Sequence, residues 1–176
     1  MKKDIWFTSD THAWHTNIIK YCNRPWDNAH DMTHAIADNI NACVPANGTL
    51  YHLGDFSWGN AMWIEGFRNM INCKKVVLIL GNHDRRIEDS QDLRKLFHGV
   101  HKIYDLDITN RKKIVLCHYS MRVWNASFHG SWHLYGHSHG TLSKYKESFD
   151  VGVDCHDYKP ISLAQVHKRM RSKEGN

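Results

Sequence analysis

The feature that most constrains this chain is a repeated arrangement in which a predicted β-strand is followed directly by Asp, Asn or His. The clusters read, in chain order, Asp10-Thr11-His12, Gly54-Asp55, Gly81-Asn82-His83-Asp84, His118 and Gly136-His137-Ser138-His139. Open α/β sheets bind their ligands at the carboxyl ends of the strands. The repetition therefore predicts an α/β fold whose polar side chains gather at one edge of a sheet.

The strands that precede these clusters are short and apolar. The clearest is Val76-Val77-Leu78-Ile79-Leu80, which is continuously apolar and rich in branched residues, as expected for a strand covered on both faces. The other predicted strands cover residues 5–7, 49–53, 102–108, 113–117, 132–135 and 149–153. Strands separated by helices come first and closely spaced strands follow, an order that predicts an α/β sandwich.

Helical periodicity occurs in the intervening segments. Apolar residues recur at intervals of three and four over residues 31–44, 64–71 and 87–97. Ser162 is an expected N-cap for a last helix that ends near Arg171, and the basic tail 171–176 is expected to fray. Residues 1–176 are the size of one domain, so we predict a single domain.

Composition excludes several classes of protein. Hydrophobic residues make up 41% and charged residues 23%, as in ordinary globular proteins, and the longest apolar run is far too short to span a membrane. The net charge of +5 falls to 19 − 17 = +2 without the tail that starts at His167, so a globally basic surface is not expected. Five widely spaced cysteines favour a reducing compartment, the cytoplasm.

The five polar clusters combine carboxylate, amide and imidazole groups, and the chain contains 15 histidines. This mixture suits Mn, Fe, Co, Ni or Zn, and the absence of Cys from the clusters argues against a closed structural zinc site. The clusters therefore predict a catalytic metal site.

In this order the clusters resemble the calcineurin-like metallophosphoesterase superfamily, whose pattern is DxH, GD, GNHD, H and GHxH. The five motifs run from Asp10 to His139, and residues 8–26 and 149–166 further resemble a small, cap-less subgroup of bacterial and phage phosphoesterases. The resemblance implies a four-layer αββα sandwich with two mixed sheets flanked by helices. It also implies a dinuclear metal centre at one sheet edge, in the cytoplasm of a bacterium or of a phage-infected host.

The resemblance implies specific metal ligands as well. One ion would be held by Asp10, His12, Asp55 and His139, and the other by Asp55, Asn82, His118 and His137. Asp55 would bridge the ions, because each carboxylate oxygen can bind one of them. Manganese is the expected metal, with iron, nickel, cobalt and zinc as alternatives, and the pair would generate a bridging hydroxide that attacks phosphorus.

His83 has no ligand role in this scheme and is therefore the predicted general acid for the departing alkoxide. Asp84 is predicted to orient His83 and to raise its pKa. The alternative is that His83 only forms a hydrogen bond within its loop.

Four other polar residues are candidates for substrate contact: Asn17, Arg24, Arg122 and His129. Arg24 would clamp a phosphate with two hydrogen bonds, or it would form a salt bridge that anchors its loop. Trp124 or Phe128 would stack a base, although core packing is the stronger expectation for Phe128.

Three histidines within or beside strands are expected to be structural or to orient metal ligands, namely His52, His133 and His156. The remaining ones, His30, His34, His98, His101 and His167, are expected at the surface.

The spacing of the clusters leaves no room for a cap domain, which predicts an open groove. The first expectation is hydrolysis of phosphodiesters in small nucleotide-type substrates. Alternatives are a nuclease, a phosphomonoesterase or a protein phosphatase, and, from another class, a non-catalytic interaction scaffold with this fold. Nucleic acid is not favoured because the sequence shows no basic, aromatic stripe. No membrane partner is expected, and the oligomeric state stays open.

Overall fold

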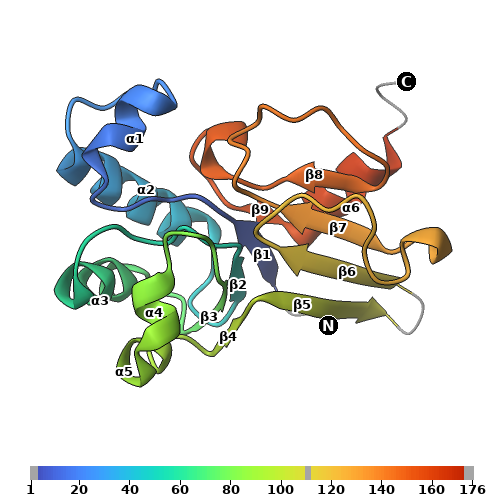
Figure 1. Cartoon of the computed structure of the whole chain (residues 1–176), viewed down its shortest axis with the longest axis horizontal. Coiled ribbons are helices and arrows are strands. Elements are labelled where there is room, and N and C mark those ends of the chain that lie inside the picture. The colour runs from blue at the N-terminus through green and yellow to red at the C-terminus, as the bar shows by residue number, and fades with distance from the viewer. Residues whose placement is uncertain (1–3, 110–111, 173–176) are drawn as a thin grey trace.

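Two β-sheets face one another across an apolar core in the computed structural model, which describes residues 4–109 and 112–172 (Figure 1). The first sheet has the strand order β4 (Gly99–His101), β3 (Lys75–Ile79), β2 (Thr49–His52), β1 (Ile5–Thr8) and β9 (Ile161–Ser162). The second has the order β5 (Ile103–Thr109), β6 (Lys112–Cys117), β7 (Trp132–Tyr135) and β8 (Ser148–Asp150).

Parallel pairing brings the polar clusters of the first sheet together. Strands β1 to β4 are parallel, and Thr8, His52 and Leu78 lie in register at their carboxyl ends. The segments that follow β1, β2 and β3 therefore leave the sheet at the same edge. Only β9 runs antiparallel, beside β1, so this sheet is mixed.

The second sheet is mixed too and delivers its own clusters to that edge. Strands β6, β7 and β8 are parallel, whereas β5 is antiparallel to β6. A bridge between Ser9 and Gly152 ties the segment after β1 to the segment after β8, and the Val153 N–H donates to Ser9 O at 3.0 Å. The carboxyl ends of the two sheets are thus joined.

Helices cover the outer face of the first sheet, on the left of Figure 1. They are α1 (Thr16–Tyr21), α2 (Ala29–Cys43), α3 (Ala61–Met70), α4 (Arg85–Asp89) and α5 (Gln91–Arg94). Ile36 and Phe67 from these helices pack with Leu78 of β3. A second apolar cluster fills the space between the sheets and includes Phe7 and Leu134. No described helix is long and apolar enough to cross a membrane.

The segment that joins β6 to β7 packs against the outer face of the second sheet at His133. The Trp124 ring lies 5.2 Å from the ring of His133, and its Nε1 donates to Ser131 O at 3.2 Å. Because Trp124 is buried there, the prediction that it stacks a base is wrong. The segment also contains the short 3-10 helix η1 (Ser127–His129), and a second one, η2 (Val153–Cys155), follows β8.

The predicted fold class, with two mixed sheets and flanking helices, is confirmed, and each predicted strand is present with slightly shifted ends. Ser162 begins α6 (Leu163–Arg171) with a capping box to Gln165, as predicted. The helix reaches Arg171, so the expected tail starts later, and its residues 173–176 lie outside the described residues.

Two local predictions are wrong. The single helix over residues 87–97 is divided at Ser90, whose backbone is extended and whose side chain instead accepts the N–H of Leu93 to begin α5. Phe128 is 77% exposed and does not pack in the core. It lies in η1 between Ala126 and Gly130, which have φ values of 57° and 79°, and these left-handed residues turn the chain so that Phe128 faces outward.

Candidate metal centre

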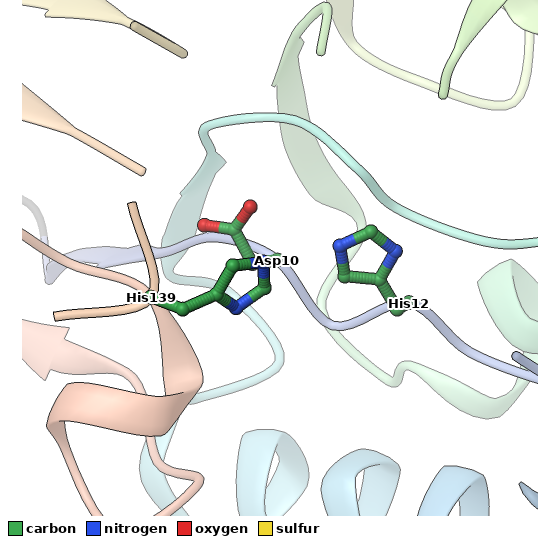
Figure 2. A group of neighbouring side chains, drawn as sticks. All are labelled: Asp10, His12 and His139. Atoms are coloured by element: carbon green, nitrogen blue, oxygen red, sulfur yellow. The ribbon is translucent and has the colours of Figure 1, made fainter. Parts of the chain in front are cut away.

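The predicted ligands meet at the edge where the two sheets end. Asp10 and His12, from the segment after β1, approach His139, from the loop after β7 (Figure 2). One potential ligand atom from each of these residues lies within 4.8 Å of those of the other two. This first ligand group contains one carboxylate and two imidazoles.

A second ligand group lies beside the first. Asp55, His118 and His137 also place potential ligand atoms within 4.8 Å of one another. Asn82 belongs to this group, because its Oδ1 lies 3.2 Å from His118 Nε2. All seven predicted ligands are therefore gathered in two adjacent groups.

Asp55 joins the two groups. Its Oδ2 lies 3.4 Å from Nε2 of His12 in the first group and 3.6 Å from Nε2 of His118 in the second. A carboxylate in this place can offer an oxygen to an ion on each side. The geometry fits the bridging position that the sequence predicted for Asp55.

The buried polar atoms of the centre fit a cation. Nε2 of His12 is buried and has no hydrogen-bond partner among the described residues, an arrangement that costs free energy unless a ligand satisfies the atom. Burial lowers the pKa of His12 well below its usual range and raises that of Asp10 well above its own. A neutral imidazole and a carboxylate whose burial is costly, as at His12 and Asp10, are donors that a divalent metal ion satisfies.

Backbone strain is concentrated at the same residues. Five of the seven predicted ligands have a positive φ, between 46° and 65°: Asp10, His12, Asp55, His137 and His139. The left-handed region costs a residue with a side chain on the order of 1 kcal/mol, and such strain clusters at functional sites. The folded state therefore carries a local backbone free-energy cost at the residues whose donor atoms lie close together.

Two glycines allow the backbone segments to approach closely at the centre. A side chain at Gly136 would overlap Ser9 Oγ and Asp10 Oδ2. At Gly54, which has a φ of 99°, a Cβ atom would lie 2.7 Å from Nδ1 of His118. These positions therefore exclude any larger residue.

The ring orientation of two histidines is fixed by hydrogen bonds on the side away from the centre. Nδ1 of His118 lies 2.7 Å from Leu53 O, so Nδ1 carries a hydrogen and Nε2 faces Asn82 and Asp55. Nδ1 of His139 lies 2.7 Å from Oδ2 of Asp154. Such partners fix the tautomer and the direction of an imidazole that binds metal.

Asp154 is a functional candidate that the sequence reasoning missed. Burial alone would raise its pKa, but hydrogen bonds from His139 and Arg24 lower it, so the carboxylate is held ionised. It follows the predicted strand 149–153 directly, which is the same signal that marked the other clusters. Asp154 therefore belongs with them as the partner of His139.

Arg24 anchors its loop and does not face a substrate. Its guanidinium is buried, with Nε and Nη2 each 2.8 Å from a carboxylate oxygen of Asp154. Nη1 and Nη2 also donate to Thr11 O and Asp10 O, at 3.0 and 2.7 Å. The prediction of a phosphate clamp is corrected to its alternative, an anchoring salt bridge, because these partners occupy the guanidinium.

His52 locks the backbone between the two groups, in agreement with its predicted structural role. Its Nδ1 accepts the Gly54 N–H at 3.3 Å, and its Nε2 lies 2.9 Å from Thr11 Oγ1, which donates to Phe56 O. Complete burial lowers the pKa of His52 to about 3, so the ring is neutral. His133 and His156 likewise have structural roles, because Nδ1 of His133 donates to Val115 O and Nε2 of His156 donates to Asp150 O.

The predicted general acid His83 lies at the opening of the centre. The exposed ring is 5.4 Å from that of His12 and 5.2 Å from that of Trp58, and it lines a hollow of about 500 Å³. The backbone N–H of His83 donates to Asp55 Oδ1 at 2.9 Å. His83 is therefore positioned by the same carboxylate that joins the two ligand groups.

Asp84 does not orient the His83 ring, and this prediction is corrected. Its buried carboxylate accepts the N–H groups of Gly81 and Asp55 at 2.8 Å and that of Phe56 at 3.0 Å. Burial raises the pKa of Asp84 to about 6, against the lowering effect of these hydrogen bonds. Asp84 instead fastens the loop after β3 to the loop after β2, which holds Asn82 beside Asp55.

The other predicted substrate contacts lie outside the two ligand groups. Asn17 is exposed on α1, and His129 is exposed at the end of η1. Arg122 is exposed with its guanidinium 5.5 Å from the centre of the Tyr145 ring. Their contact with substrate stays a prediction.

The fold and the site define an α/β sandwich protein with a candidate two-metal centre at the sheet edge. The model of the calcineurin-like phosphoesterase superfamily domain matches residues 4–152. The chain therefore belongs to the calcineurin-like phosphoesterase superfamily.

Individual relatives extend over nearly the whole chain. The uncharacterized protein MJ1445 of Methanocaldococcus jannaschii is 31% identical and covers 94% of this chain and 90% of its own length. The crystal structure of the protein of unknown function AQ665 from Aquifex aeolicus covers 95% of this chain and 99% of its own, at a TM-score of 0.77 and 25% identity. The nuclease MPE of Pseudomonas putida is more distant, with a TM-score of 0.48, 19% identity and coverage of 77% and 60%.

Proposed function

We propose that this chain is a phosphodiesterase that uses two divalent metal ions, manganese foremost, and acts on small nucleotide-type substrates. The observation that carries the proposal is the position of Asp55 Oδ2, which lies 3.4 Å from a histidine nitrogen of one ligand group and 3.6 Å from one of the other. Asp10, His12 and His139 would hold the first ion with Asp55, and Asn82, His118 and His137 the second.

A bound ion pair lowers the pKa of a coordinated water and neutralises charge that develops on phosphate oxygens. The chain itself supplies the alignment. Asp84 holds the Asp55 and Asn82 loops together through three backbone N–H groups. Asp154 and Leu53 O fix the rings of His139 and His118.

His83 is proposed as the general acid. It is exposed at the opening of the centre while its backbone N–H is held by Asp55 Oδ1, so its ring can reach a leaving group without being a ligand. A positioned acid of this kind contributes about 10²–10⁴ in rate when the leaving group is a poor one. A hydrogen bond within the loop is the competing role.

A preference for diesters is proposed because the site is open. The hollow beside His83 has a volume of about 500 Å³ and is lined in part by Trp58, Arg85 and Arg86. An open site of this kind leaves room for a second ester group, and the two arginines would favour an anionic substrate.

The five free cysteines fit a reducing compartment, for which we propose the cytoplasm.

The proposal is tested by stripping the protein of metal, reloading it with Mn²⁺, and comparing hydrolysis of bis(p-nitrophenyl) phosphate with that of p-nitrophenyl phosphate. We expect activity that depends on metal and a higher kcat/KM for the diester. A higher kcat/KM for the monoester would instead indicate a phosphatase. Two bound ions without turnover of either ester would favour the scaffold function.

The role of His83 is separable with leaving groups of different quality. His83→Ala should lower turnover of a cyclic nucleotide, whose alkoxide needs a proton, by at least about 10², and should lower turnover of the nitrophenyl diester far less. Metal content should be unchanged. Equal losses on both substrates would contradict the assignment of His83 as general acid.

A further inference from the structure

We propose that a surface formed by exposed Tyr119, Arg122, Phe128 and Lys146 and half-buried Tyr145 binds single-stranded nucleic acid and leads it to the metal centre. We call this surface the aromatic–basic track. Binding by the track stands independently of the activity proposed above, whereas delivery of a phosphodiester to the metals rests on that activity and extends its substrates from small nucleotides to strands.

The topology of the second sheet places two segments along the same path. Strands β6, β7 and β8 are parallel, so the chain must return from the carboxyl edge to the amino edge after β6 and again after β7. Tyr119, Arg122 and Phe128 lie in the first return segment and Tyr145 and Lys146 in the second. Each segment therefore starts at the metal centre and runs the length of the strands away from it.

Contacts between side chains show that the two segments lie side by side. The Arg122 guanidinium is 5.5 Å from the centre of the Tyr145 ring. The Lys146 ammonium is 5.2 Å from the centre of the same ring and 5.0 Å from that of Phe128. Residues more than 15 apart in the sequence thus form one alternating row of cations and rings.

Tyr119 lies where the first return segment leaves the metal centre. The Tyr119 ring lies 5.0 Å from the ring of His118 and 4.9 Å from the ring of His137, both of which belong to the second ligand group. Because His137 is itself exposed, a strand on the track has an open approach to the centre.

The composition of the surface matches the backbone and bases of a single strand. The two return segments contain Arg122, Lys144 and Lys146 but a single acid, Glu147, although the chain without its tail is near neutral. Phe128 is 77% exposed and Tyr119 is 46% exposed. Exposed rings between cations are typical of surfaces on which unpaired bases stack while phosphates are neutralised.

The sequence reasoning found no such stripe because the row is not continuous in the chain. It alternates between two segments, and only their packing on the second sheet interleaves the rings with the cations. A base-paired duplex hides the faces of its bases, so stacking on these rings favours a single strand.

The test measures binding of a fluorescein-labelled oligothymidylate of about a dozen nucleotides by fluorescence anisotropy. The full chain is used without metal, in EDTA, so that no hydrolysis occurs. The double variant Phe128→Ala/Lys146→Ala should bind at least about tenfold more weakly, because it loses one stacking ring and one phosphate contact. The slope of log K against log[salt] should fall by about 0.7 for the lost lysine.

The matched control is Tyr21→Ala/Lys74→Ala, which removes another exposed ring, 73% exposed, and another exposed lysine away from the track. It should keep its affinity within about twofold. Both variants change exposed side chains, and thermal unfolding verifies that each is folded.

Equal affinity of the track variant and the unaltered protein would overturn the proposal, as would an equal loss in the control. A duplex of the same length that binds as tightly as the single strand would overturn the stacking role of the rings. Hydrolysis of the nitrophenyl diester is measured separately, so loss of strand binding and absence of phosphodiesterase activity are distinguishable.

Discussion

The two ligand groups of the centre share Asp55 but differ in how they are held. In the first group Asp10 and His12 are buried, and His139 is hydrogen-bonded to Asp154, which is itself paired with buried Arg24. In the second group His118 is buried and fixed by Leu53 O, but Asn82 and His137 are exposed at the surface.

This difference predicts separate roles for the two ligand groups. Donors whose own partners are buried lose little freedom when they bind, whereas exposed donors must be ordered by the ion. We therefore expect the first group to hold its ion more tightly, and the second group to exchange its ion and to face the substrate. The track also begins at the second group, because Tyr119 contacts His118 and His137.

The largest effect should follow from removing the carboxylate that both halves share. Asp55→Asn removes the negative charge that faces both groups through Oδ2, so both ions should be weakened and kcat/KM for the nitrophenyl diester should fall by about 10³ or more. Metal content by mass spectrometry and kinetics check this. Asp38→Asn, which changes an exposed carboxylate on α2, is the control and should behave like the unaltered protein. Retention of two tight ions would show that Asp55 does not bridge.

The second ligand group is tested by His137→Ala. Loss of this predicted ligand should lower the affinity for the second ion by more than the 10–100-fold that is typical when a residue hydrogen-bonded to a metal ligand is changed. The affinity for the first ion should stay the same. Calorimetric titration of the metal-free protein with Mn²⁺ separates the two steps. Equal weakening of both ions would mean that the halves are not independent.

The first ligand group is tested by Asp154→Asn. The amide is a weaker acceptor for the His139 ring and leaves the Arg24 guanidinium without its ion pair, so the first ion should be weakened by about 10–100-fold. The same titration should show the second ion unchanged. If the affinity of the tighter Mn²⁺ binding step were unaffected, Asp154 would stabilise the fold and would not position a metal ligand.

The smallest expected effect is on the pH dependence of the free energy of unfolding. His52 is buried and neutral with a pKa of about 3, while the unfolded chain takes up the proton near pH 6.5. The folded state therefore loses stability as the pH falls from about 6.5 toward 3, and between about pH 7.5 and 5 this amounts to about 2 kcal/mol. His52→Gln removes that part of the pH dependence, as measured by urea unfolding of metal-free protein.

The control for this last measurement is His98→Gln, which replaces an exposed imidazole. It should leave the pH dependence of the unfolding free energy as it is in the unaltered protein. The same loss of stability in His52→Gln and the unaltered protein would place the acid sensitivity elsewhere.

Local signals in the sequence were sufficient for most of the fold and for the shared location of the predicted ligands. Continuous apolar runs gave the strands, and the polar residues directly after them are the ones that parallel pairing gathers at one edge. The backbone also approaches closely at Gly136 and Gly54, which belong to two of these clusters.

Properties that depend on distant contacts could not be predicted. Arg24 pairs with Asp154, 130 residues away, and only this contact decides between a phosphate clamp and an anchor. Asp84 was assigned to its sequence neighbour His83, but parallel pairing of β2 with β3 presents it with three backbone N–H groups instead. Phe128 was expected in the core because its type is apolar, and two left-handed neighbours turn it outward.

Titration of metal-free protein with Mn²⁺, followed by electron paramagnetic resonance, tests whether Asp55 holds two ions side by side. We expect binding of two ions per chain and a spectrum of exchange-coupled Mn²⁺ pairs, because one carboxylate would bridge them. A single bound ion, or two ions with the spectrum of isolated Mn²⁺, would contradict the bridging role of Asp55.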